Sequence, residues 1–316
     1  MTSATRDPAA GPAAAGPAEQ GLITAVPLRR PGRSISALII LVVVALLVYG
    51  AATNNAYQWG LYGKYVFDRR FTQAALVTLW LTVIAMAVAV LLGALLAVMR
   101  LSDNPVLRGT AWAYLWLFRG TPIYVQLVFW GLITSIYKHL DLGIPFVHQF
   151  AHIDTQTAFT LFEFAAIGLA LNEAAYMAEI VRAGINSVNE GQSEAAVALG
   201  MSWPLTMRRV VLPQAMRVII PPTGNELISL LKTTSLVVAV PYVHDLFAVA
   251  NNIGNALYAP IPLLLVASTW YLAITSVLMV GQFYLERHFA RGSSRKVTAR
   301  QLRAQARLEK SHAGAR

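Results

Sequence analysis

Residues 191–213 read GQSEAAVALGMSWPLTMRRVVLP and form a polar interruption between two long apolar segments. Ser193 can cap a short helix over residues 194–199, and Gly200 can supply the left-handed stop that ends this helix. Such a helix is about 10 Å long, which is too short to cross a bilayer. We therefore expect it to lie at a surface, where a partner protein can contact it.

A second short helix is predicted to follow the first directly. Ser202 can cap this helix, Pro204 is tolerated in its first turn, and Pro213 bars its continuation. The two helices together form a polar loop, and the segments on either side of it are predicted to lie in a membrane.

The composition of the whole chain supports a membrane protein. Of its 316 residues, 56% are hydrophobic and only 13% are charged, and the mean hydropathy of +0.54 is far from that of a soluble domain. The sequence contains no cysteine, which excludes disulfides and thiolate metal sites. A single bundle of several transmembrane helices is the expected architecture.

Apolar runs of sufficient length predict about six transmembrane helices, and hence an all-α membrane protein. The sequence Arg119-Gly120-Thr121-Pro122 is predicted to break the third of these helices, and the polar residues 232–235 to interrupt the fifth. We expect residues 138–156 and 241–262 to be external loops. The six runs cover residues 35–53, 74–99, 106–137, 157–185, 214–240 and 263–285.

The first apolar run follows a leader, residues 1–34, that is rich in Ala, Gly and Pro and is predicted to be disordered. The run could instead belong to a signal peptide that is cleaved near Gly50-Ala51-Ala52, but it is long for such a peptide. We therefore favour an uncleaved transmembrane helix at residues 35–53.

The distribution of basic residues predicts the orientation in the membrane. The tail, residues 286–316, holds nine Lys and Arg residues, whereas the two expected external loops hold only Lys138. Since cytoplasmic segments carry the excess of basic residues, both termini are expected in the cytoplasm of a multi-pass protein. Lys64, Arg69 and Arg70 are the exceptions, because they fall on the predicted external side.

The net charge of +10 therefore has a topological explanation, and no nucleic acid partner is expected. Contact with anionic membrane lipid is enough to account for the basic tail. No phosphate-binding GxxxxGK[ST] motif occurs in the sequence, because Gly63-Lys64 is followed by Tyr65. No metal-ligand cluster or nucleophile motif is found either, so we expect no cofactor, no metal and no catalytic site.

The polar loop resembles the EAA loop of bacterial ABC-importer permeases. The spacing of the Glu-Ala-Ala triplet, a glycine and a closing Leu-Pro matches that family, and Val210 stands where the family usually has Ile. The resemblance implies that the loop docks into a groove on a separate ATPase subunit. The expected ATPase-coupling residues are Glu194, Ala195, Ala196, Gly200, Leu212 and Pro213.

Further motifs resemble the branch of these permeases that carries polar amino acids such as histidine, glutamate, glutamine, arginine and the opines. The resemblance covers residues 72–285 and implies the five-span core of a type I importer, so the helix at residues 35–53 is an addition to that core. The matching residues are Arg119-Gly120-Thr121-Pro122, Gln126, Ala175-Tyr176, Glu179, Arg182, Gly184, Gly191-Gln192, Asn225-Glu226, Lys232, Thr234, Ser235 and Leu236.

Charged side chains in apolar helices need partners, because they are costly in a bilayer. Glu179 and Arg182 are three residues apart on one helical face and are predicted to form a structural ion pair. Glu226 is predicted to face the ammonium or cationic side chain of a substrate. Lys232, Thr233 and Ser235 are predicted to line the neighbouring polar part of the pathway. The alternative is a buried Glu226–Lys232 pair that only stabilises the bundle.

Position 233 bears on the substrate. The family commonly has Asp after the lysine, whereas this chain has Thr233. One negative charge is therefore missing, which weakens the case for a strongly cationic substrate and favours a neutral or acidic polar amino acid. The identity of the amino acid stays open.

The resemblance implies a permease subunit of an ATP-driven importer in the bacterial inner membrane, which is not itself an enzyme. The implied partners are an ABC ATPase dimer, a second permease half that is identical or related, and an extracytoplasmic substrate-binding protein. The alternative is a secondary amino acid transporter or channel that works without ATP, since charged intramembrane residues occur there too. The polar loop distinguishes the two classes, because only an ATP-driven importer has a use for it.

Overall fold

The computed structural model describes residues 31–144 and 148–289 of the 316-residue chain. Nearly all of the leader that is predicted to be disordered, residues 1–30, lies outside the described residues, as does most of the basic tail, residues 290–316. The chain divides into two units, of which the first ends at Thr53 and the second begins at Asn54.

Helix α1 (Pro31–Thr53) is the described part of the first unit. It begins four residues before the predicted span, at a proline whose ring suits the first turn of a helix. Residues 35–50 are all exposed, and all but Ser36 are apolar or glycine. A helix that is apolar on every face is stable only in an apolar surrounding, so α1 has the surface of a lipid-embedded helix.

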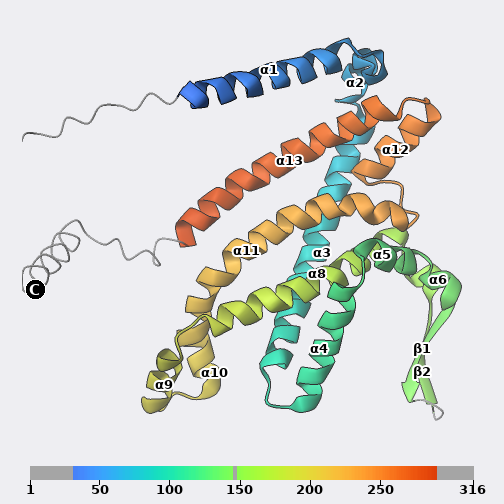
Figure 1. Cartoon of the computed structure of the whole chain (residues 1–316). Coiled ribbons are helices and arrows are strands. Elements are labelled where there is room, and N and C mark those ends of the chain that lie inside the picture. Colours follow the sequence, from blue (N-terminus) through green and yellow to red (C-terminus); the bar gives the residue numbers. More distant parts are fainter. Residues whose placement is uncertain (1–30, 145–147, 290–316) are drawn as a thin grey trace, which may run out of the picture. The chain divides into compact units, whose positions relative to one another are not determined.

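The second unit is a bundle of helices with one β-hairpin (Figure 1). A 3₁₀ turn, η1 (Asn55–Tyr57), precedes its first helix. The elements that follow are α2 (Trp59–Tyr65), α3 (Arg69–Leu101), α4 (Pro105–Gly120), α5 (Ile123–Gly131), α6 (Ile133–Ile136), β1 (His139–Ile144), β2 (His148–Asp154), α7 (Thr155–Ala158), α8 (Leu161–Asn186), α9 (Glu190–Ala198), α10 (Trp203–Thr206), the π-helical turn η2 (Met207–Val211), α11 (Leu212–Thr233), the 3₁₀ helix η3 (Thr234–Ala239), α12 (Leu246–Ala256) and α13 (Pro260–Phe289).

Helices α3 and α8 form the centre of this unit, and small residues let them approach closely. A Cβ atom added to Gly93 of α3 would lie 2.6 Å from the Cβ of Met177 and 3.0 Å from the carbonyl oxygen of Ala174, both on α8. The alanines at this contact are buried: Ala85, Ala89, Ala170, Ala174 and Ala178. The contact therefore depends on the absence of larger side chains.

Four of the described helices are long and apolar enough to cross a bilayer, namely Ile35–Thr53, Arg69–Leu101, Leu161–Asn186 and Pro260–Phe289. The other two predicted spans are interrupted helices. Thr121 and Pro122 separate α4 from α5, and α11 gives way to η3 at Thr234, so both predicted interruptions are confirmed. The all-α membrane fold is thus confirmed.

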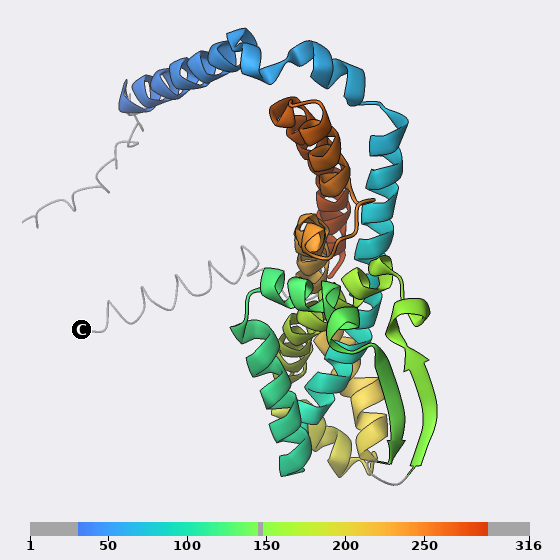
Figure 2. The same ribbon diagram turned by 90° about the vertical axis from the view of Figure 1, so that its right-hand side faces the viewer.

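The two predicted external loops contain regular structure that was not anticipated. In the first, β1 and β2 pair antiparallel, with an irregularity between Leu142 and Gly143 (Figure 2). Leu140, Leu142 and Ile144 alternate with other residues along β1, which is the pattern of a strand. In the second, α12 packs on α13 and α3, and the backbone N–H of Leu246 donates to the Thr78 hydroxyl at 3.0 Å.

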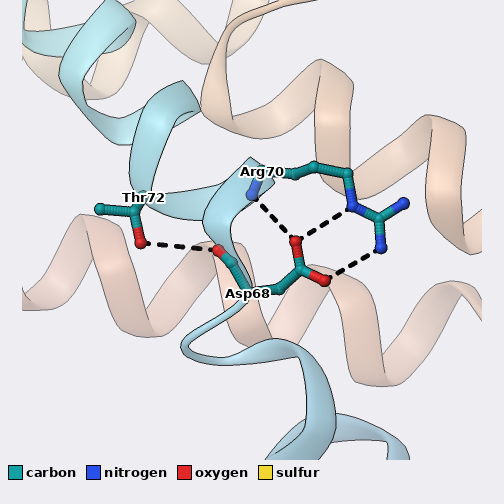
Figure 3. Close-up of polar contacts among 3 residues, drawn as sticks. All are labelled: Asp68, Arg70 and Thr72. Atoms are coloured by element: carbon teal, nitrogen blue, oxygen red, sulfur yellow. Dashed lines mark hydrogen bonds and ion pairs between the residues drawn. The ribbon is translucent and has the colours of Figure 1, made fainter.

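The start of α3 explains one of the basic residues on the predicted external side. Asp68 caps the helix, and its carboxylate accepts bonds from the backbone N–H of Arg70 at 2.9 Å and from the Arg70 guanidinium at 3.0 Å (Figure 3). Arg70 and Lys64 also lie 5.4 and 5.6 Å from the ring centroid of Tyr65. The bonds from Arg70 hold the pKa of Asp68 below its ordinary value. Arg70 is therefore neutralised locally.

Candidate functional site

The first helix of the polar loop, α9, begins at Glu190 rather than after Ser193. Asn189 is its N-cap, because the Asn189 side chain accepts from the backbone N–H of Gly191 at 2.9 Å. Ser193 was predicted in this role and lies inside the first turn instead. Asn and Ser are equally good caps, and residues 190–193 contain nothing that prevents a helix, so the earlier cap extends it.

Gly200 ends α9 in the left-handed conformation, with φ of 78°, as its sequence position predicts. Two backbone bonds complete the stop, from Gly200 N–H to the Val197 oxygen at 2.9 Å and from Met201 N–H to the Ala196 oxygen at 3.0 Å. A Cβ atom at Gly200 would have no described atom within 4 Å. The requirement for glycine is therefore conformational rather than steric.

The second helix of the loop does not stop at Pro213. Ser202 stands at the N-cap position of α10 and Pro204 lies in its first turn, although no described group donates a capping bond to the Ser202 side chain. The chain then passes through the π-helical turn η2 into α11, with Pro213 in the first turn of that helix. The N–H groups of a first turn have no partner within the helix, so a proline is tolerated there. Pro213 was predicted to end a helix, but it stands at the start of α11 instead.

The predicted coupling residues lie mostly on the surface of this loop. Glu194, Ala195, Gly200, Leu212 and Pro213 are exposed, and only Ala196 is buried, at 3%. Apolar side chains accompany them on the same loop. Val197, Leu199 and Trp203 are all exposed, Leu199 at 83%. The loop therefore combines small residues with an apolar surface that the described chain leaves uncovered.

The predicted substrate residues separate into two groups. Lys232 and Ser235 line a pocket of about 250 Å³ together with Phe247 of α12 and Tyr271 of α13. Glu226 and Thr233 are not among the residues that line it. Six residues along a helix amount to about 600° of rotation, so Glu226 and Lys232 point to different faces. A direct Glu226–Lys232 ion pair does not form in the described structure.

Hydroxyl groups around this interruption satisfy backbone carbonyls of α11. Thr233 donates to the Ser229 oxygen at 3.0 Å, Thr234 to the Leu231 oxygen at 2.7 Å and Ser235 to the Lys232 oxygen at 2.8 Å. Backbone groups at an interruption in a membrane need such partners. The three hydroxyls therefore stabilise the change from α-helix to 3₁₀ helix.

Glu173 on α8 is a candidate site residue that sequence reasoning did not place. It is 6% exposed, and its Oε1 atom has no hydrogen-bond partner among the described residues. The charge of Glu226, a half-buried residue of α11, acts on the Glu173 carboxylate. The signal in the sequence was a charged residue in the middle of an apolar helix, but Glu226, whose charge acts on it, lies 53 positions later and could not be identified from one sequence.

The side-chain amides of Asn172 and Gln126 form hydrogen bonds around the break between α4 and α5. Asn172 donates to the Phe118 oxygen and to the Gln126 side chain, both at 3.0 Å. Gln126 in turn donates to the Thr121 hydroxyl at 2.7 Å, across the break between α4 and α5. The break is therefore held by defined hydrogen bonds, which tie it to α8 at the residue that precedes Glu173 in the sequence.

Glu179 and Arg182 form an ion pair on α8. The Arg182 Nη2 and Nε atoms donate to Glu179 Oε2 at 2.7 and 3.1 Å. Their spacing of three residues puts both side chains on one helical face, which is the geometry that the sequence predicts.

Residues 89–291 match the family described as the binding-protein-dependent transport system inner membrane component. The chain belongs to this family. It is the permease of a binding-protein-dependent ABC importer for amino acids, a multi-pass membrane protein, and not an ATP-independent transporter or channel.

Three proteins similar to this chain are permeases or transporters of amino acids by their names. The chain is 59% identical to the arginine transport system permease protein ArgU of Corynebacterium glutamicum, over 91% of this chain and 89% of that protein. It is 37% identical to the histidine/lysine/arginine/ornithine transport system permease protein HisM of Salmonella typhimurium, over 66% and 85% respectively. A crystal structure of an amino acid ABC transporter with histidines is 32% identical, with a TM-score of 0.58, over 70% of this chain and 95% of that chain.

The match to the first of these relatives extends beyond the family core toward the N-terminus. The match spans 288 of the 316 residues, so it must include residues 35–53. The match to HisM is shorter, at 213 residues. Helix α1 lies outside residues 89–291, the part of the chain that the family model matches.

Proposed function

We propose that this permease imports a cationic amino acid, with arginine as the first candidate. Glu173 and Glu226 carry this proposal, because Glu173 is buried on α8 and the charge of Glu226, a half-buried residue of α11, acts on it. Buried like charges are unfavourable unless a cation joins them. A guanidinium or ammonium group is such a cation, and the relatives ArgU and HisM are transporters of arginine and related amino acids by their names.

This proposal revises the expectation drawn from Thr233. That expectation counted only the residues beside Lys232, where an acidic side chain is missing. Glu173 supplies a second negative charge from α8 instead of α11. Lys232 and Ser235, in their separate pocket, are proposed to line the adjoining polar part of the pathway.

Competitive uptake tests the substrate class. The permease, its ATPase and its binding protein would be reconstituted, and uptake of arginine would be measured with glutamine and glutamate as competitors. We expect Glu226→Gln and Glu173→Gln each to reduce arginine uptake at least tenfold, because each removes a charged partner of a cation. Glutamate or glutamine as the preferred substrate would overturn the proposal.

Glu163→Gln is the matched control, because Glu163 lies on the same helix but at its exposed start. Its carboxylate belongs to a capping box with Thr160. Glutamine also fits the capping box, so this variant should transport arginine like the wild type. Equal losses in Glu163→Gln and Glu173→Gln would indicate that the effect is not specific to the carboxylate pair.

We further propose that α9 and the Gly200 stop transmit the motion of a separate ATPase dimer to the bundle, and that a second permease half and an extracytoplasmic binding protein complete the importer. The exposed apolar residues of the loop support this proposal, because an uncovered surface of that kind marks a protein contact. Copurification of the ATPase with wild type, and its loss with Glu194→Lys, is the expected result. Retention of the ATPase by Glu194→Lys at wild-type levels would contradict it.

The proposed topology places both termini and the polar loop in the cytoplasm. Since the sequence has no cysteine, single introduced cysteines report accessibility without background. Tyr258, which is 93% exposed in the predicted external segment, should react as Tyr258→Cys with an impermeant thiol reagent in intact cells. Leu199→Cys should react only after permeabilisation, and the reverse pattern would invert the topology.

A further inference from the structure

A pocket of about 430 Å³ lies between the end of α3, the helix α4 and the middle of α8. It shares no lining residue with the pocket of Lys232, and neither Glu173 nor Glu226 lines it. Its walls include two arginines, one carboxylate and three aromatic residues: Arg100, Arg119, Glu179, Trp112, Trp116 and Tyr176. None of the residues proposed for the substrate or for ATPase coupling is among those that line it.

The pocket has an excess of positive charge. Among the described residues, neither Arg100 nor Arg119 forms an ion pair. The Nε atom of Arg100 is buried without a hydrogen-bond partner in the described part of the chain, and the Arg119 guanidinium lies over the Tyr176 ring at 5.4 Å. Glu179 is the one carboxylate at the wall, and its Oε2 atom accepts two bonds from Arg182, so three arginines stand against a single carboxylate.

The surroundings of the two arginines are those of a membrane interface. Arg100 stands in the last turn of α3, a helix long enough to span the bilayer. Trp112 and Trp116 lie one turn apart on α4, are both exposed, and stack with 6.3 Å between their ring centroids. Tryptophan is enriched where hydrocarbon meets lipid headgroups, and basic pockets between transmembrane helices bind lipid headgroups.

We propose that this pocket binds the phosphate of an anionic phospholipid. The guanidinium groups of Arg100 and Arg119 hold the phosphate oxygens, since guanidinium matches phosphate with paired charge-assisted bonds. Trp112 and Trp116 contact the glycerol and the upper acyl chain. A zwitterionic lipid is a weaker ligand, because its ammonium group adds a positive charge where arginines already outnumber the single carboxylate. The site goes beyond the proposed function and does not depend on the identity of the substrate.

Lipid retention tests the site directly. The full chain, purified with its partner subunits, would be delipidated in detergent and titrated with phosphatidylglycerol or phosphatidylcholine under native mass spectrometry. Wild type should retain phosphatidylglycerol preferentially. Arg100→Gln and Arg119→Gln should each weaken this retention about tenfold, the equivalent of one charge-assisted contact.

Three further variants separate the site from general effects. Arg108→Gln is the matched control, because Arg108 is exposed on α4 and does not line the pocket. It should retain phosphatidylglycerol like the wild type. Glu179→Gln should bind the lipid more tightly, because it removes the only carboxylate at the wall. The double Arg100→Lys, Arg119→Lys variant keeps both positive charges and should retain most of the preference for phosphatidylglycerol. This variant tests whether substitution at these two positions leaves the pocket folded.

The outcomes distinguish the sources of the phosphate. Inorganic phosphate at millimolar concentration should not displace the lipid. Displacement by phosphate alone, without a preference for phosphatidylglycerol, would assign the pocket to a soluble anion and overturn the lipid proposal. Equal retention of both lipids by wild type, or unchanged retention in the Arg→Gln variants, would overturn it as well.

Discussion

The contact between α3 and α8 is tightly packed, whereas the loop from α9 to α10 exposes apolar side chains. At the α3–α8 contact, small residues bring two helices together until a single added Cβ would overlap with Met177. In the loop, Val197, Leu199 and Trp203 stay exposed and Gly200 has open space around it. The first region is completed within the chain, whereas the second has a surface that the described part of the chain leaves uncovered. The difference predicts that substitutions in the first affect folding and those in the second affect transport.

Gly93→Leu should have the largest effect. The added side chain would overlap with Met177 and the backbone of Ala174 and Ala178, which overpacks the centre of the bundle. We expect a loss of about 3 kcal/mol of stability, seen as a lower thermal midpoint and aggregation on size-exclusion chromatography. Gly109→Leu on α4 is the control, since no described atom lies within 4 Å of its Cβ position. Similar behaviour of the two variants would refute the steric explanation.

Gly200→Val should reduce transport while the bundle stays folded. A β-branched residue at φ of 78° is strained by roughly 1–2 kcal/mol. This strain is confined to the end of α9, so the rest of the bundle should fold normally. Gly200→Asn is the comparison, because asparagine tolerates the left-handed conformation. ATP-driven uptake should therefore fall strongly in the valine variant and little in the asparagine variant. Equal uptake by both variants would show that the conformation of the stop does not matter.

Leu199→Ser should weaken ATPase binding with almost no effect on the stability of the isolated permease. Burial of a leucine side chain in an interface contributes about 2 kcal/mol, so the affinity should fall at least tenfold. The exposed position makes a stability change beyond about 0.5 kcal/mol unexpected. Titration of the permease with the ATPase measures the first effect and thermal unfolding the second. A large loss of stability would mean that the loop is also completed within the chain.

The smallest effect is expected from acidification at the start of α3. The pKa of Asp68 is held below its ordinary value of 3.8 by its bonds to Arg70. A lowered pKa in the folded state adds stability that is present above the ordinary pKa and is lost as the pH falls through the folded value. The pair is partly exposed, so this contribution is below about 1 kcal/mol. Between pH 6 and pH 3 the wild type should therefore lose slightly more stability than Asp68→Asn, and parallel curves would contradict this.

Local patterns predicted those features that one segment can specify by itself. The apolar runs, the helix break at Thr121-Pro122, the left-handed Gly200 and the Glu179–Arg182 spacing all depend on residues within one or two helical turns. The EAA spacing was likewise sufficient to identify the importer family, which the match over residues 89–291 confirms. The start of α9 was misplaced because two good caps compete there and sequence does not rank them.

The sequence by itself determined the membrane architecture, the polar loop and the class of transporter, because hydropathy, turn geometry and motif spacing are local properties. Only the tertiary structure decided that Glu226 and Lys232 form no ion pair among the described residues, and that Arg100 shares a pocket with Arg119. The physical reason is the rotation of each helix about its axis. Packing between helices sets this rotation, and it determines which charges meet across tens of residues.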